Sequence, residues 1–396
     1  MLARGGVVTR LNDILNANVR GGSIPGAVAM VAHGDELEVA TVGTVDIDGS
    51  APMARDSLFR IASLTKPIIA AAVLMLVEDG WIAMDDPVAE WLPELASPTV
   101  VRTPRSPVDD VVPAVRPITV TDLLTSRAGY GFPADFSLPA VALLLDEVQI
   151  FGRDPQLVGG LDEWMTALSR VPLLHQPGEA WLYNTCSDIQ GVLVSRVAGR
   201  SLPEFLAQRI FQPLSMVDTG FDVPSDKLDR FTSYYEPAAA GGLVLADTPD
   251  GQWARPPAFP SGAGGLVSTV DDWYAFARML LAQGSTADGR ELLSPAAVRE
   301  MTTNHLTRSQ REASTLFLEG QGWGYGGSVD VESLEAWNEF GRYGWVGGTG
   351  TAGHVSAATG TITILLTQVA MTGPTTTPLM REFWTSAAAG AAVGGR

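Results

Sequence analysis

The chain contains the stretch Phe59-Arg-Ile-Ala-Ser63-Leu-Thr-Lys66-Pro67, in which a lysine follows a serine after three residues. In a helix this spacing places both side chains on one face, about one turn apart. Only Lys66 and Lys227 among the 26 basic residues are lysines, so a lysine at this place calls for a chemical reason. A desolvated amine can lose its proton, whereas a guanidinium stays charged. The stretch therefore predicts a serine nucleophile, Ser63, with Lys66 to manage its proton.

The composition is typical of a globular protein and argues against several classes of partner. The 396 residues are 46% hydrophobic, include 42 Gly and 26 Pro, and carry a net charge of −18. This charge argues against a nucleic-acid partner, and no apolar run is long enough to span a membrane. The single Cys186 excludes an internal disulfide. No metal-ligand cluster or nucleotide loop is visible, so we expect neither a metal nor a cofactor.

The N-terminal residues 7–15 have the pattern of an amphipathic helix. They lack the apolar core and the small-residue cleavage site of a signal peptide. We therefore expect a cytoplasmic protein. The sequence leaves the oligomeric state open.

The hydrophobic pattern predicts an α/β (α+β) protein with an antiparallel sheet flanked by helices. Alternating residues predict hairpins at 27–42 and at 353–369, and the apolar run 64–79 predicts a buried helix. A further strand near 262–269 precedes a predicted helix at 270–281. Terminal hairpins and helices suggest one sheet that is assembled from both ends of the chain.

The middle of the chain has a different texture, because short helical patterns alternate with Pro-rich turns. We interpret residues 96–255 as a large, mostly helical insertion domain. Residues 1–95 and 256–396 then form the α/β domain, and the active site lies between the two domains.

Three further segments are candidates for the site, and each has a structural alternative. Tyr183, in Trp181-Leu-Tyr-Asn-Thr185, is either a proton-transfer group or a core aromatic. Trp345-Val-Gly-Gly348 either admits a substrate against a strand edge or forms an ordinary glycine turn. The segment 260–269 either contributes to the site or caps a helix with Ser268 or Thr269.

Taken in order, these segments resemble those of the β-lactamase-like serine hydrolases, which include class C β-lactamases, D-stereospecific peptidases and family VIII esterases. The resemblance covers about residues 25–370. It rests on motifs in the family's order: Ser63-Leu-Thr-Lys66, Met84-Asp-Asp-Pro-Val88, Leu123-Leu-Thr-Ser-Arg-Ala-Gly129, Pro177-Gly178, Tyr183 and Gly264-Gly-Leu-Val-Ser-Thr269.

The resemblance implies a β-lactamase/transpeptidase-like fold and an acyl-enzyme mechanism. It assigns Ser63 as the nucleophile, with Lys66 and Tyr183 sharing the proton transfers. The backbone amides of Ser63 and Gly348 would form the oxyanion hole. The predicted substrate-binding residues are the neighbours of these motifs, namely Trp181, Thr185, Trp345, Val346 and Gly347.

Two departures from the family pattern favour an ester substrate. β-Lactamases have Tyr-x-Asn and Lys-Thr-Gly, whereas this chain has Thr185 after Tyr183 and the triplet Trp345-Val346-Gly347. An indole in place of the lysine disfavours an anionic substrate, and Trp-x-Gly resembles the family VIII esterases. The prediction is a serine hydrolase of small carboxylic esters. The alternatives are a β-lactam or D-amino-acid amide or peptide hydrolase, an acyltransferase, and a non-catalytic binding protein.

Replacing Lys66 by arginine tests the proposed need for an amine. We expect Lys66→Arg to be nearly as inactive as Lys66→Ala, because a guanidinium cannot take a proton from the serine. Initial rates with a p-nitrophenyl ester measure the effect. An active arginine variant would mean that position 66 supplies only positive charge.

Overall fold

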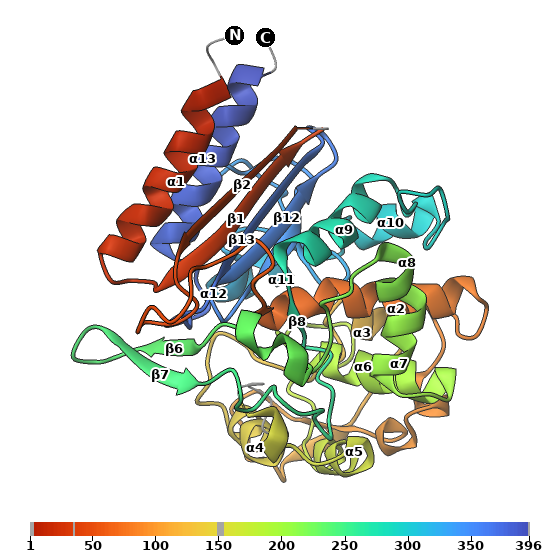
Figure 1. Ribbon diagram of the computed structural model, residues 1–396. Coiled ribbons are helices and arrows are strands. Elements are labelled where there is room, and N and C mark those ends of the chain that lie inside the picture. The colour runs from red at the N-terminus through yellow and green to blue at the C-terminus, as the bar shows by residue number, and fades with distance from the viewer. Residues whose placement is uncertain (1–3, 35, 149–153, 395–396) are drawn as a thin grey trace.

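The computed structural model describes residues 4–34, 36–148 and 154–394, and a seven-stranded antiparallel sheet forms its centre (Figure 1). The strand order across the sheet is β2 (Glu36–Gly43), β1 (Gly26–His33), β13 (Thr361–Thr367), β12 (Thr351–Ser356), β11 (Tyr343–Gly347), β10 (Ser328–Val329) and β9 (Gly322–Trp323). Strand β1 pairs with its hairpin partner β2 and also with β13 from the other end of the chain. The two predicted hairpins and the predicted sheet class are confirmed.

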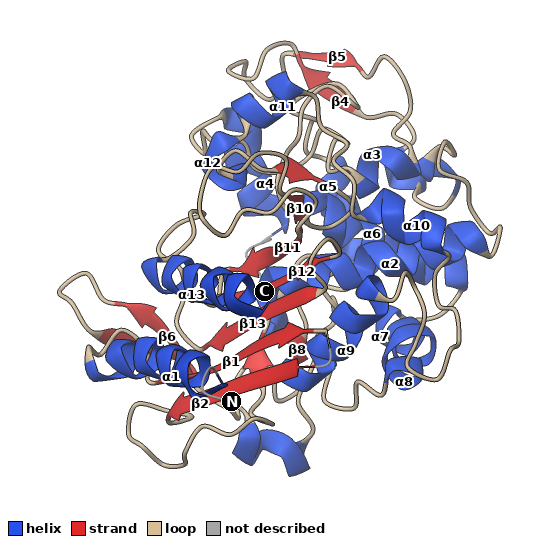
Figure 2. Cartoon of the chain, turned by 90° about the horizontal axis from the view of Figure 1, so that it is seen from above, coloured by secondary structure: helices blue, strands red, loops and turns tan. Residues whose placement is uncertain are grey.

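Helices cover both faces of this sheet. On one face α1 (Arg4–Arg20) lies beside α13 (Pro378–Gly394), and on the other α9 (Val270–Leu281) contacts β12 and β13 (Figure 1, Figure 2). Helix α2 (Thr65–Glu78) is buried from Thr65 to Leu76, as its apolar sequence predicts. Thr269 caps α9 by accepting a hydrogen bond from the backbone N–H of Asp272, so the end of segment 260–269 is a helix cap, while Ser261, Ala263 and Gly264 of the same segment line a cavity.

The segment between the two halves of the sheet is built mostly from short helices. These are α3 (Val120–Leu124), α4 (Pro139–Val148), α5 (Leu161–Ser169), α6 (Thr185–Ala198), α7 (Leu202–Leu206) and α8 (Gln212–Leu214). Two hairpins, which the sequence analysis missed, also lie here: β4 (Thr99–Val101) with β5 (Val111–Pro113), and β6 (Tyr234–Pro237) with β7 (Leu243–Asp247). The division into two domains stays a prediction.

The remaining elements complete the frame around the site. Strand β3 (Phe59–Arg60) pairs with β8 (Val267–Ser268), and helices α10 (Pro295–Met301), α11 (Arg308–Ala313) and α12 (Thr315–Leu318) precede β9. Within the described part of the chain, no helix has both the length and the apolar character needed to cross a membrane.

Contact between the sheet and α9 depends on a glycine. A Cβ atom on Gly353 of β12 would lie 2.5 Å from the Trp273 ring of α9. We expect Gly353→Ala to lower the free energy of unfolding by about 1–3 kcal/mol, because a buried indole has no room to retreat. Urea denaturation measures the loss. As a control, Gly373→Ala should be near neutral, since an added Cβ there meets nothing within 4 Å. Equal stability of both variants would contradict this packing argument.

Candidate active site

Ser63 stands on a short, strained link between two elements. Strand β3 is followed by a 3₁₀ turn, Ala62–Leu64, and α2 begins directly after this turn. Ala62 has a φ of +44°, a left-handed conformation that is uncommon for a residue with a side chain. Such strain persists only where the surrounding structure fixes it, and it occurs often at functional sites. The turn leaves Ser63 half-buried, whereas Lys66 one turn later is 1% exposed.

Three oxygen atoms surround the Lys66 amine. Nζ lies 2.8 Å from Asn184 Oδ1, 2.6 Å from the Ala263 carbonyl oxygen and 3.0 Å from Ser63 Oγ. Burial lowers the pKa of Lys66 to about 7, against the opposing effect of the Asp188 charge. A neutral amine has two N–H groups and one lone pair. It can donate to Asn184 and Ala263 and still accept the proton of the Ser63 hydroxyl.

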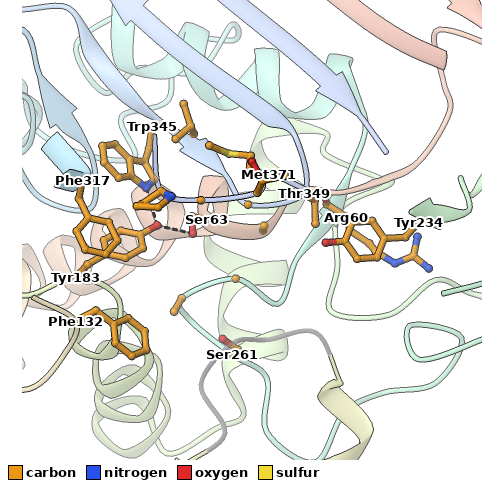
Figure 3. A pocket seen from close by; sticks show the side chains of 18 of the residues that line it. Arg60, Ser63, Phe132, Tyr183, Tyr234, Ser261, Phe317, Trp345, Thr349 and Met371 are labelled. Atoms are coloured by element: carbon orange, nitrogen blue, oxygen red, sulfur yellow. Dashed lines mark hydrogen bonds between the residues drawn. The ribbon is translucent and has the colours of Figure 1, made fainter. Parts of the chain in front are cut away.

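Tyr183 approaches Ser63 from the other side. Its hydroxyl donates to Ser63 Oγ at 2.7 Å, and Trp345 Nε1–H donates to the Tyr183 oxygen at 2.8 Å (Figure 3). Burial raises the pKa of Tyr183 to about 12, although the hydrogen bonds to Ser63 and Trp345 lower it. Tyr183 is therefore protonated at neutral pH. A phenolate base does not fit these surroundings, so a proton-transfer role for Tyr183 would use the neutral hydroxyl group.

Asn184 is a site residue that the sequence analysis overlooked. Its φ of +83° and ψ of −71° are those of a γ-turn with positive φ, and Thr185 N–H donates to the Tyr183 carbonyl at 3.3 Å across it. This strained turn presents the Asn184 amide oxygen to Lys66, and α6 begins directly after it. The amide sits one position earlier than in the Tyr-x-Asn pattern. A search at the family's spacing could not find it.

Asp188, on α6, is a second overlooked residue. Its carboxylate accepts hydrogen bonds from Ser261 Oγ at 2.6 Å and from the Ala263 N–H at 3.0 Å. Burial raises the pKa of Asp188, while these bonds and the Lys66 charge lower it. Because Lys66 donates to the Ala263 carbonyl, this short loop connects both buried groups. Asp188 thus positions an acceptor of Lys66.

A cavity of about 320 Å³ opens over Ser63. On one side of Ser63 are aromatic rings, including Phe132, Phe317 and Trp345, and on the other are Met371 and Tyr234 (Figure 3). The walls combine residues of the middle segment with residues of both chain ends. A cavity of this size and lining is typical of sites for small ligands.

The predicted site residues fall into two groups, those that line this cavity and those that do not. Ser63, Tyr183, Trp345, Val346 and Gly348 line the cavity, so the structure brings together the proposed nucleophile, its tyrosine and both oxyanion residues. Lys66 lies directly behind Ser63.

Three predicted substrate-binding residues do not line this cavity. Thr185 is fully buried at the start of α6, and Trp181 is buried with its ring centroid 5.9 Å from that of Tyr183. A Cβ on Gly347 would lie 2.5 Å from the Ile61 carbonyl oxygen, so this glycine lets β11 pack against the residues just before Ser63. These contacts give the three residues a structural role, and their contact with substrate stays a prediction. In the described part of the chain, no cluster of three or more His, Cys, Asp or Glu residues suits a metal ion.

The arrangement agrees with a match to a known family. The model of the Beta-lactamase family matches residues 11–380. The chain belongs to the Beta-lactamase family. Among its Beta-lactamase-family relatives, protein Rv1367c of Mycobacterium tuberculosis is 38% identical, with 83% of this chain and 82% of the relative covered. Esterase EstB of Burkholderia gladioli is 31% identical, with 94% of each chain covered.

A solved structure supports the fold. EstCE1, a hydrolase with promiscuous acyltransferase activity, superposes with a TM-score of 0.81 at 22% identity, covering 98% of this chain and 100% of that one. The antiparallel sheet flanked by helices is thus a β-lactamase/transpeptidase fold. The chain is a Beta-lactamase-family enzyme, in the class of serine hydrolases and acyltransferases.

The lowered pKa of Lys66 leads to a pH dependence. The neutral amine is the form that accepts the Ser63 proton, so kcat/KM for an ester should be level above about pH 7 and fall about tenfold per unit below it. Initial rates with p-nitrophenyl butyrate at low substrate concentration measure this profile. A flat profile from about pH 5 to about pH 8 would contradict a base that titrates near neutrality.

Proposed function

We propose that this enzyme is a carboxylesterase that hydrolyses small, uncharged esters through an acyl-enzyme on Ser63. The main observation behind this proposal is that the cationic side chains near the cavity are already bonded to other groups of the protein. The relationship to esterase EstB supports it.

Acylation begins with Ser63 Oγ attacking the ester carbonyl carbon while Lys66 Nζ takes its proton. The tetrahedral oxyanion lies between the backbone N–H groups of Ser63 and Gly348, which stabilise the developing charge. Lys66 then returns the proton through Tyr183 to the leaving alcohol oxygen, and the carbon–oxygen bond breaks. Water attacks the acyl-enzyme in the same way, with the same groups accepting and returning its proton, and the acid leaves.

The preference for uncharged substrates follows from the state of the nearby cations. Lys66 is buried behind Ser63, and its amine is surrounded by three oxygen atoms. Arg60 lines the cavity, but it is paired with Asp247 at 2.5 Å and donates to the Thr232 carbonyl at 2.7 Å. A substrate carboxylate would lose its hydration here without gaining an unengaged cation.

Trp345 adds a second reason. Its N–H is engaged by Tyr183, so the ring face remains for apolar contact with an acyl or alcohol group. Hydrolysis of an amide or β-lactam, and acyl transfer to an alcohol, use the same acyl-enzyme and remain the alternatives. The cytoplasmic location and the absence of nucleic-acid and membrane partners stay predictions from the sequence.

The ratio of nitrocefin to p-nitrophenyl butyrate hydrolysis tests the substrate class. We expect wild type to favour the ester and Ser63→Ala to lose both activities. Loss of fluorophosphonate labelling in Ser63→Ala would identify the nucleophile. Faster hydrolysis of nitrocefin than of the ester by wild type would replace the esterase proposal with the amide alternative.

Substitutions of Trp345 test whether this side chain selects against anionic substrates. Trp345→Lys should raise the nitrocefin-to-ester ratio about tenfold or more, because a charge-assisted donor then faces the substrate anion. Total activity should fall, since Tyr183 loses its indole donor. As a control, Trp345→Phe removes the same donor without adding charge, so it should lower both activities and leave the ratio unchanged. Equal ratios in the two variants would show that position 345 does not select against anions.

A further inference from the structure

A second cavity, of about 480 Å³, lies beneath α13 against the sheet. Its floor consists of neighbouring residues of β12 and β13, including His354, Ser356 and Thr363. Its roof includes Trp384 of α13, and the loop before β11 closes one side with Trp337. His354 follows Gly353, which faces α9, so strand alternation directs the histidine to the α13 face of the sheet.

Polar atoms without partners are concentrated in the residues that line this cavity. Within the described residues no hydrogen-bond partner reaches His354 Nδ1, Ser356 Oγ, Thr363 Oγ1, Trp384 Nε1 or the terminal nitrogens of Arg342. All five residues are more than nine-tenths buried. Buried polar groups in native proteins nearly always have partners, and each exception calls for an explanation. Five exceptions around one cavity point to a ligand that supplies the partners.

Arg342 is the charged member of this group. Its Nη1 lies 3.7 Å from Asp330 Oδ2, which is beyond good hydrogen-bond distance. The Asp330 carboxylate already accepts from Gln321 Nε2 at 2.7 Å, from Asn338 Nδ2 at 3.1 Å and from the Glu339 backbone N–H at 3.0 Å. Burial lowers the pKa of Arg342 to about 10, which still leaves it charged at neutral pH. The guanidinium therefore retains donors for another acceptor.

The donors and walls together define the ligand class. Guanidinium and indole nitrogens only donate, and the hydroxyl groups can also donate, so the ligand must be rich in acceptors. Trp337 and Trp384 supply apolar walls that a bare inorganic anion would leave unfilled. One acidic side chain, Glu339, also lines the cavity, and its carboxylate accepts from Thr359 Oγ1 at 3.0 Å.

We propose that this cavity binds an organic acid, with its carboxylate near Arg342, Ser356 and Thr363 and its apolar body against the two indoles. The site is separate from Ser63 and does not depend on the proposed esterase activity. A cavity of about 180 Å³ shares Trp345 with the active-site cavity and His354 with this one. The test therefore uses protein whose Ser63 carries a phosphonate, which blocks the active site.

The probe is benzoate, whose ring suits the indoles, and calorimetry and thermal unfolding measure its binding. We expect saturable binding of benzoate and a rise in Tm, with a much smaller rise for inorganic phosphate. Comparable effects of benzoate and phosphate would replace the organic acid by a simple anion. No saturable binding of benzoate to the blocked protein would overturn the proposal and leave ordered water as the partner of these groups.

A matched pair of variants on β13 assigns the binding to this cavity. Thr363→Val removes a hydroxyl that has no hydrogen-bond partner among the described residues, whereas Thr367→Val removes one that donates to the Gly350 carbonyl at 2.9 Å. Thr363→Val should weaken benzoate binding about tenfold with no loss of Tm in the free protein. Thr367→Val should lower Tm and keep the affinity. Ser356→Ala provides a second, shape-conserving variant with the Thr363→Val pattern. Unchanged affinity in both Thr363→Val and Ser356→Ala would contradict the assignment.

Discussion

Burial of a single amine governs the chemistry and much of the architecture around it. An ammonium group removed from water is costly, so the protein either provides acceptors or the amine loses its charge. Lys66 shows both effects, since two oxygens accept its N–H groups while burial lowers its pKa to about 7. The remaining lone pair is then available to Ser63 Oγ, which lies 3.0 Å from Nζ and carries a removable proton. Desolvation thus gives Lys66 the property that its proposed role as a base requires.

Holding this geometry requires unusual backbone on both sides of the amine. Ala62 adopts a left-handed conformation before the nucleophile, and Asn184 forms a strained γ-turn before α6. A glycine at 347 permits β11 to approach the residues just before Ser63 closely. The large buried helix α2 and the sheet supply the packing that maintains these conformations. Two of the strained backbone positions in the protein thus lie directly beside residues whose side chains meet at the site.

The sequence predicted the main hairpins and the contact of Ser63 with Lys66 well, because the patterns behind these predictions are local in the chain. Alternation at 27–42 and 353–369 predicted the hairpins, and the spacing of Ser63 and Lys66 predicted their contact. Hairpins inside the middle segment were missed, since strands of three to five residues are too short to show a clear periodicity. The hydrogen bond from Lys66 to an amide oxygen was missed for a different reason. A γ-turn at Asn184 presents this amide one position earlier than the Tyr-x-Asn pattern would, and no residue pattern encodes that turn. The same shift leaves Thr185 fully buried at the start of α6.

Contacts across the fold were also beyond sequence reasoning. Trp345 lines the cavity over Ser63, but its hydrogen bond to Tyr183 depends on the packing of β11 against the middle segment. The buried polar group beneath α13, with Arg342 at its edge, arises only when β12, β13 and α13 meet. Both features depend on contacts between segments far apart in the chain.

The protonation state of Lys66 is the most direct test of this account, and the chain suits the measurement because it has two lysines. Protein labelled with ¹³C at lysine Cε should give two lysine signals, and a Lys227→Arg variant assigns the one from Lys66. We predict that the Lys66 signal titrates near pH 7 in the folded protein. A Lys66 amine that stays fully protonated up to about pH 9 would contradict the central claim, because desolvation would then not have produced a base.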